Sequence, residues 1–114
     1  LLHVVPDAVV ALPDAAMPAP LPTAELGALT DAGKDGLKNL VAALGLEARR
    51  PRLEVRIGSP GHEITAAAKD LGADLVCVST HGRDGLSRVF LGSIAEQVVR
   101  HAPCPVLTVR PGAH

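Results

Sequence analysis

Hydrophobic residues recur along the chain with two periods, and these periods predict strands and helices in alternation. Short aliphatic runs predict strands over residues 1–5, 53–57, 74–79 and 106–109. Apolar residues spaced three and four apart predict helices over residues 23–44, 60–71 and 93–102. Gly45 and Gly72 follow the first two helical patterns, and Pro103 follows the third. Residues of these types commonly end helices, so each predicted helix has a stop signal.

The order of these elements predicts the fold class. Strands that alternate with helices require right-handed crossovers, which produce a parallel sheet covered by helices on both faces. The first connection is the exception, because residues 6–22 contain five of the ten prolines and predict a long irregular loop. We therefore expect a three-layer α/β/α domain of the Rossmann-like class.

The amino-acid composition argues against nucleic acid as a binding partner. The 114 residues are enough for one domain, and 47% hydrophobic with 20% charged residues is typical of a folded chain. Phe90 is the only aromatic residue and the net charge is −1, so neither base stacking nor a basic surface is available for nucleic acid. The basic cluster at 49–52 is interpreted as a solvated loop. No apolar run is long enough to span a membrane.

The two cysteines indicate neither a zinc site nor a disulfide framework. Cys77 and Cys104 are not in Cys-x-x-Cys spacing. Cys77 lies in an apolar run, which predicts a small core residue. This usage favours a reducing compartment, and we expect a cytoplasmic protein.

The candidate chemistry lies between the third and fourth predicted strands. The sequence there reads Ser79-Thr-His-Gly82, then nine residues, then Gly92-Ser93. Ser93-Ile-Ala-Glu96 has the pattern of a capping box, with Ser93 as the predicted N-cap. A glycine turn after a strand and a glycine at a helix N-terminus expose main-chain amides at the positive end of a helix dipole. The pattern therefore predicts an anion site, with a nucleotide phosphate as the ligand.

Signals for catalysis are weak by comparison. The chain has no Gly-x-x-x-x-Gly-Lys loop, no pair of carboxylates at catalytic spacing and no nucleophile–base arrangement. Asp84 is a single candidate contact to magnesium through water. Hydrolysis of a bound nucleotide is expected to be slow at most, and phosphotransferase or hydrolase function is the least favoured of three hypotheses.

Residues 74–111 strongly resemble the C-terminal half of the universal stress protein family. The family signature is Gly, two residues, Gly, nine residues, then Gly-Ser or Gly-Thr, and here Ser79 replaces the first glycine. A serine fits that turn where its φ is negative. The resemblance extends more loosely through Gly58-Ser-Pro60 and Leu1-Leu-His-Val-Val5, and so covers essentially the whole chain.

The resemblance implies five parallel strands in the order 3-2-1-4-5. The run at 1–5 matches the second of these strands, so strand 1 and its helix are missing from the sequence. We therefore expect residues 1–114 to be a single universal-stress-type domain that is incomplete at its N-terminus. Because strand 1 is central in that order, its absence would leave unpaired main chain on both neighbouring strands.

The resemblance also implies a function, which is regulatory binding of ATP, or of ADP or AMP, in a stress response. A magnesium ion would accompany the nucleotide. The contacts are expected along the carboxyl ends of the strands. By resemblance, the expected binding residues are Val4, Val78, Ser79, His81, Gly82, Arg83, Gly92, Ser93, Ile94 and Ala95. The alternative is a nucleotide-free, dimeric interaction module of the same fold. In either case the partner is expected to be a second copy, paired through the last strand at Val106, Leu107, Thr108 and Val109.

Overall fold

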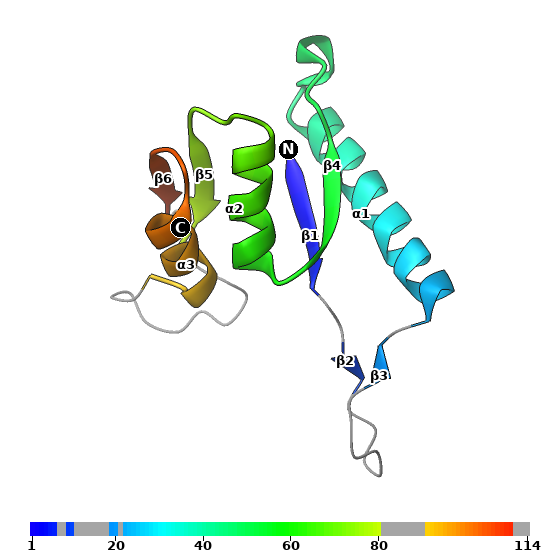
Figure 1. Ribbon diagram of the computed structural model, residues 1–114. Helices are drawn as coiled ribbons and strands as arrows, with labels where there is room; N and C mark the ends of the chain where they lie inside the picture. Colours follow the sequence, from blue (N-terminus) through cyan, green and yellow to red (C-terminus); the bar gives the residue numbers. More distant parts are fainter. Residues whose placement is uncertain (7–8, 11–18, 21, 81–90, 111–114) are drawn as a thin grey trace. The chain divides into compact units, whose positions relative to one another are not determined.

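The computed structural model describes residues 1–6, 9–10, 19–20, 22–80 and 91–110 (Figure 1). The chain divides into two compact units, Leu1–Ser59 and Pro60–His114. Each unit contains one pair of parallel strands and at least one helix that packs on it. The mixed α/β class predicted from the alternating pattern is therefore confirmed.

The first unit is built on β1 (Leu2–Pro6) and β4 (Glu54–Gly58). The two strands are parallel, with Leu2 opposite Glu54 and Pro6 opposite Gly58. Between them in sequence lies α1 (Thr23–Ala43), which packs against both strands. This is the crossover that parallel pairing requires. Three apolar side chains are buried at this packing surface: Val5, Leu37 and Val41.

Part of the proline-rich connection is ordered in a way that the sequence did not predict. A short antiparallel pair forms from β2 (Val9–Val10) and β3 (Ala19–Pro20). The expectation of an irregular loop was therefore wrong for these four residues. Pro20 is accommodated because each strand has only two residues and one partner, so the missing amide breaks no central ladder.

The three glycines in α1 do not interrupt the helix, and one of them has a packing role. A Cβ on Gly33 would lie 2.9 Å from Cδ2 of His3 and 3.4 Å from the methyl groups of Val55. A Cβ on Gly27 or Gly36 would have no neighbour within 4 Å. Gly33 thus allows the helix to approach β1 and β4 closely, whereas the other two are only weak helix formers.

We expect substitution by alanine to have opposite effects at Gly33 and Gly36. Gly36→Ala should raise the free energy of unfolding by about 0.5–1 kcal/mol, because alanine loses less entropy in a helix. Gly33→Ala should lower it by about 1 kcal/mol, because the His3 ring must move to make room. Urea denaturation of the two variants measures both changes. An equal gain in both variants would show that the close approach at Gly33 has no energetic importance.

The second unit contains α2 (Pro60–Asp70), β5 (Val76–Ser79), α3 (Ser93–His101) and β6 (Val106–Val109). The strands are parallel, with Val76 opposite Val106 and Ser79 opposite Val109. The two helices pack against each other. Their buried residues are Gly61, Ala67, Ala68, Ala95 and Val98. The core of this unit is therefore made of small aliphatic groups at close approach.

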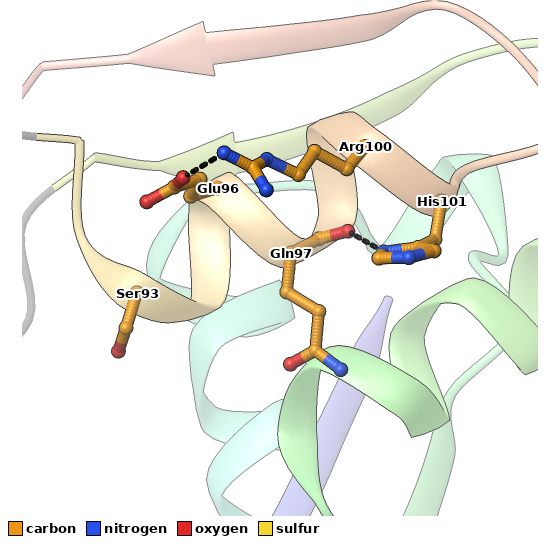
Figure 2. A pocket seen from close by; sticks show the side chains of 5 residues that line it. All are labelled: Ser93, Glu96, Gln97, Arg100 and His101. Carbon is orange, nitrogen blue, oxygen red and sulfur yellow. Dashed lines mark hydrogen bonds and ion pairs between the residues drawn. The ribbon is translucent and has the colours of Figure 1, made fainter.

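Gly61 makes that close approach possible. A Cβ at this position would overlap the side-chain amide of Gln97 on α3. Gln97 extends from α3 toward α2 (Figure 2). The glycine leaves the space that this side chain occupies between the two helices.

Both glycine stop signals are confirmed. Gly45 has φ of 62° and Gly72 has φ of 59°, which is the left-handed conformation that glycine adopts without a Cβ penalty. Beyond α1, the amides of Gly45 and Leu46 donate to the carbonyls of Ala42 and Val41. The matching pair after α2 is formed by the amides of Gly72 and Ala73. Each turn satisfies carbonyls that the helix end leaves open.

The interior placement predicted for Cys77 was wrong, because this side chain is exposed. Its neighbour in the register, Leu107, is exposed as well, at 52%, and the aliphatic pattern of the strand did not reveal which of its residues are exposed. The last helix shows a similar difference, because Ala95 and Val98 are buried whereas Ile94 and Val99 are 45% and 47% exposed. None of the described helices has the length and hydropathy required to cross a membrane.

Candidate functional site

The candidate site is the N-terminal end of α3, which starts differently from the sequence prediction. Gly92, with φ −58° and ψ 151°, is the N-cap, and Ser93 is the first helical residue. No side chain caps the helix, so the predicted capping box at Ser93 was wrong. A glycine N-cap leaves the first turn without the side-chain acceptor that serine would supply.

Gly92 is held against the end of β5 by the main chain. Its amide donates to the carbonyl oxygen of Thr80 at 3.0 Å, and the Thr80 amide donates to the carbonyl of Val109 on β6. A Cβ on Gly92 would lie 3.0 Å from the same Thr80 oxygen, which leaves little room for any larger residue. The start of α3 is thus anchored directly beyond the carboxyl end of β5. Sequence reasoning missed Thr80, since a main-chain acceptor has no residue-type signal.

This anchor changes the expected role of Gly92. Its amide is already bonded to Thr80, so it is not an available donor for a ligand. The amides of Ser93, Ile94 and Ala95 follow it, and none has a main-chain acceptor among the residues described. The intrahelical bonds begin with Glu96, whose amide donates to the Gly92 carbonyl at 2.9 Å. Three main-chain donors at the positive end of a helix form a group that can hold an anion.

Ser79 ends β5 with ordinary strand geometry. Arg50 is the only non-glycine residue with positive φ among those described, so the condition for a serine at the first signature position is met. The hydroxyl group of Ser79 is on an exposed residue at the carboxyl end of the strand. The replacement of the first signature glycine therefore causes no backbone strain.

Val78 and Val4 differ in the availability of their main-chain groups. On β5, the amides of Val76 and Thr80 donate to Pro105 and Val109 on β6. The amides and carbonyls of successive residues point to opposite edges of a strand. The main chain of Val78 therefore also points toward β6 and takes part in the ladder. Val4 is in the other unit, where the Glu54 amide donates to the Leu1 carbonyl. By the same alternation, the main chain of Val4 points away from β4.

Three predicted site residues lie outside the described part of the chain: His81, Gly82 and Arg83. Asp84, the candidate magnesium contact, lies outside it as well. These positions remain predictions. The described part of the site is the start of α3 with Ser79 and Thr80, and no group of three or more potential metal ligands was found among the residues searched.

A separate hollow lies along the side of α3 (Figure 2). It has a volume of about 210 Å³ and is lined by Ser93, Glu96, Gln97, Arg100 and His101. Glu96 and Arg100 form an ion pair at 2.7 Å. Nδ1 of His101 lies 2.9 Å from the Gln97 carbonyl oxygen, and since a carbonyl only accepts, Nδ1 is the donor. The charged groups lining this hollow are thus paired with each other, and it is less suited to an anion than the helix start.

The chain is similar to known universal stress proteins. The chain is 37% identical over 82 residues to universal stress protein MJ0531 of Methanocaldococcus jannaschii, covering 72% of this chain and 48% of that protein. It is 42% identical over 76 residues to a putative universal stress protein of Staphylococcus epidermidis, covering 66% and 45%. The chain therefore spans about half the length of the curated relatives that it matches.

Solved structures agree at the level of the fold. The structure resembles UspA of Lactobacillus plantarum with a TM-score of 0.67 and 28% identity, over 96% of this chain and 74% of that one. It resembles hypothetical protein MJ0577 with a TM-score of 0.68 and 24% identity, over 99% and 75%. A model of the universal stress protein family matches residues 1–110. The chain belongs to the universal stress protein family.

Proposed function

We propose that this protein binds an adenine nucleotide (ATP, ADP or AMP) as a regulatory ligand, with the phosphates at the start of α3. The observation that carries the proposal is the first turn of that helix. Ser93, Ile94 and Ala95 present three amides without acceptors among the residues described, and the N-cap is a glycine with no side chain to occupy them.

The anchoring of Gly92 supports this assignment. The bond from Gly92 to the Thr80 carbonyl fixes the direction in which the next three amides point. Donors fixed in advance bind an anion without paying the entropy of ordering a loop. The site also lies at the carboxyl end of β5, the end at which open α/β sheets bind their ligands.

Binding rather than turnover is the proposed activity. The sequence contains no phosphate-loop lysine, so the arrangement that positions a γ-phosphate in that enzyme class is missing. His81, Gly82 and Arg83 belong to the proposed contacts by resemblance, and Asp84 is the proposed partner of a magnesium ion through water. Hydrolysis is expected to be slow and incidental, and the physiological role is a stress response.

Calorimetric titration of the purified protein with ATP, ADP and AMP tests the proposal. We expect saturable binding of at least one of the three, and release of the same nucleotide from protein purified under native conditions, identified by mass spectrometry. A flat titration with all three, together with no co-purified nucleotide, would instead support the nucleotide-free interaction module.

We also propose that two copies pair through β6. In the described part of the chain β6 has one strand neighbour, β5, so its second edge has no ladder. Leu107 and Val109 on this strand are 52% and 45% exposed. An exposed apolar edge strand favours association with another strand. A two-fold axis would place β6 of one copy against β6 of the other.

Thr108→Pro is expected to convert the dimer to a monomer without unfolding it. The carbonyls of Pro105 and Val109 accept hydrogen bonds from β5. Because successive residues of a strand direct their main-chain groups to opposite edges, the main chain of Thr108 points away from β5. A proline here removes one amide from the outer edge only, where proline is tolerated. Sedimentation equilibrium measures the mass, and circular dichroism checks the fold. Thr108→Val is the matched control, and a dimer that persists in Thr108→Pro would exclude pairing through this edge.

A further inference from the structure

We propose that Arg110, the residue directly after β6, determines the specificity of the anion site at the start of α3. Its guanidinium group binds the outer phosphates of a nucleoside diphosphate or triphosphate, and the amides of the first helical turn bind the phosphate that AMP, ADP and ATP share. The site then prefers ADP and ATP to AMP. This inference rests on the proposed function, because it assigns a further contact to the same site.

Two main-chain hydrogen bonds connect the end of β6 to the start of α3. The Thr80 amide donates to the Val109 carbonyl, and the Thr80 carbonyl accepts from the Gly92 amide, both at 3.0 Å. The three amides without acceptors among the described residues directly follow Gly92. Because Arg110 directly follows Val109, its main chain lies one residue from this series of hydrogen bonds.

The register of the strands indicates on which face of the pair Arg110 lies. The register of β5 and β6, continued by one residue, places Arg110 opposite Thr80. Residues opposite each other share a face, and side chains alternate between faces along a strand. Val76, Val78 and Thr80 are partly buried, whereas Cys77 on the other face is exposed. Arg110 therefore lies on the more buried face, which is the face expected to carry α3 because α3 packs on β6.

The other lysine and arginine residues described in this unit lie at the opposite end of the strands. Within residues 60–80 and 91–110 these are Lys69 and Arg100. They are in the last turns of α2 and α3, which lead to the amino ends of β5 and β6. Arg100 is also paired with Glu96 at 2.7 Å (Figure 2). Within the described part of this unit, a guanidinium or ammonium group beside the start of α3 therefore comes from Arg110.

Three amides and one guanidinium group suit a chain of phosphates better than a single one. The amides of Ser93, Ile94 and Ala95 belong to one helical turn, so they converge on one phosphate group. A guanidinium group binds phosphate oxygens in a bidentate manner and carries a full positive charge. ADP and ATP have further phosphate groups for this contact, whereas AMP has none. Arg110 should therefore strengthen the binding of ADP and ATP and contribute little to the binding of AMP.

Calorimetric titration of Arg110→Gln with ATP, ADP and AMP tests this assignment. We expect the affinities for ATP and ADP to fall roughly 10- to 100-fold, as for the loss of a hydrogen bond between charged groups. The affinity for AMP should change by less than about twofold, because a more distant charge is screened by salt. Arg110→Lys keeps the charge but loses the bidentate geometry, so its loss for ATP and ADP should be intermediate.

Arg100→Gln is the matched control for the change in net charge. It removes one positive charge from the other end of α3, where the side chain is 69% exposed, and should leave all three affinities near those of the parent protein. Arg110 is exposed as well, so both variants are expected to keep the circular dichroism spectrum of the parent. Equal losses of ATP affinity in Arg100→Gln and Arg110→Gln would show an effect of net charge and would overturn the assignment.

Failure of this inference and failure of the proposed function give different results. ATP binding that Arg110→Gln leaves unchanged would overturn the role of Arg110 alone. An equal loss for ATP, ADP and AMP, or a parent protein that binds AMP as tightly as ATP, would exclude selection by the outer phosphates. A parent protein that binds none of the three nucleotides would contradict the proposed function and this inference with it.

Discussion

Replacing Ser93 by proline is expected to weaken nucleotide binding roughly 10- to 100-fold, the loss of one hydrogen bond to a charged group. Proline at the first helical position removes one of the three donors, the Ser93 amide, and leaves every intrahelical bond in place. The preceding residue, Gly92, has φ −58° and ψ 151°, which is the extended conformation that a residue before proline prefers. The variant should therefore fold normally while its affinity falls, as measured by calorimetric titration with ATP.

Ser93→Ala is the matched control for this prediction. It removes the hydroxyl group but retains the amide, so its affinity should stay near that of the parent protein. A large loss in Ser93→Ala would assign the contact to the hydroxyl group instead. Unchanged binding in Ser93→Pro would place the phosphates away from the first turn of α3, and the proposed site would be wrong.

Val98→Ala is expected to lower the free energy of unfolding by about 2–3 kcal/mol, from lost transfer free energy and the cavity left behind. Val98 is fully buried in the second unit, at 0% exposure, where α3 packs. Its neighbour Val99 is 47% exposed, and Val99→Ala should change stability by less than about 0.5 kcal/mol. Urea denaturation of the two variants measures the difference. Similar losses in both would contradict the observed orientation of α3.

The hydrophobic pattern of the last helix does not determine which of Val98 and Val99 is buried. Both residues fall in the apolar stripe predicted for the last helix, and the sequence treats them alike. A nine-residue helix with its apolar positions on adjacent faces is compatible with several rotations about its axis. The tertiary structure has one of these rotations, in which Val98 is fully buried while α3 packs against α2 and Gly61 leaves space for Gln97.

The helix start at Gly92 shows a similar limit. Sequence reasoning correctly placed a glycine and a helix N-terminus at this position, but it assigned the cap to Ser93. Serine is the better cap by local chemistry. The tertiary bond from the Gly92 amide to the Thr80 carbonyl fixes the chain one residue earlier, and it converts an expected ligand donor into an anchor.

The sequence by itself determined the alternation of strands and helices, the glycine-terminated helix ends and membership of the universal stress protein family, because these depend on local periodicity and residue type. Only the tertiary structure decided which face of each element is buried, which amides at α3 have no acceptor among the described residues and which edge of β5 pairs with β6. Those properties depend on contacts between residues far apart in the chain, such as Thr80 with Val109 and Val76 with Pro105. The spacing of residue types within a short segment cannot predict such contacts.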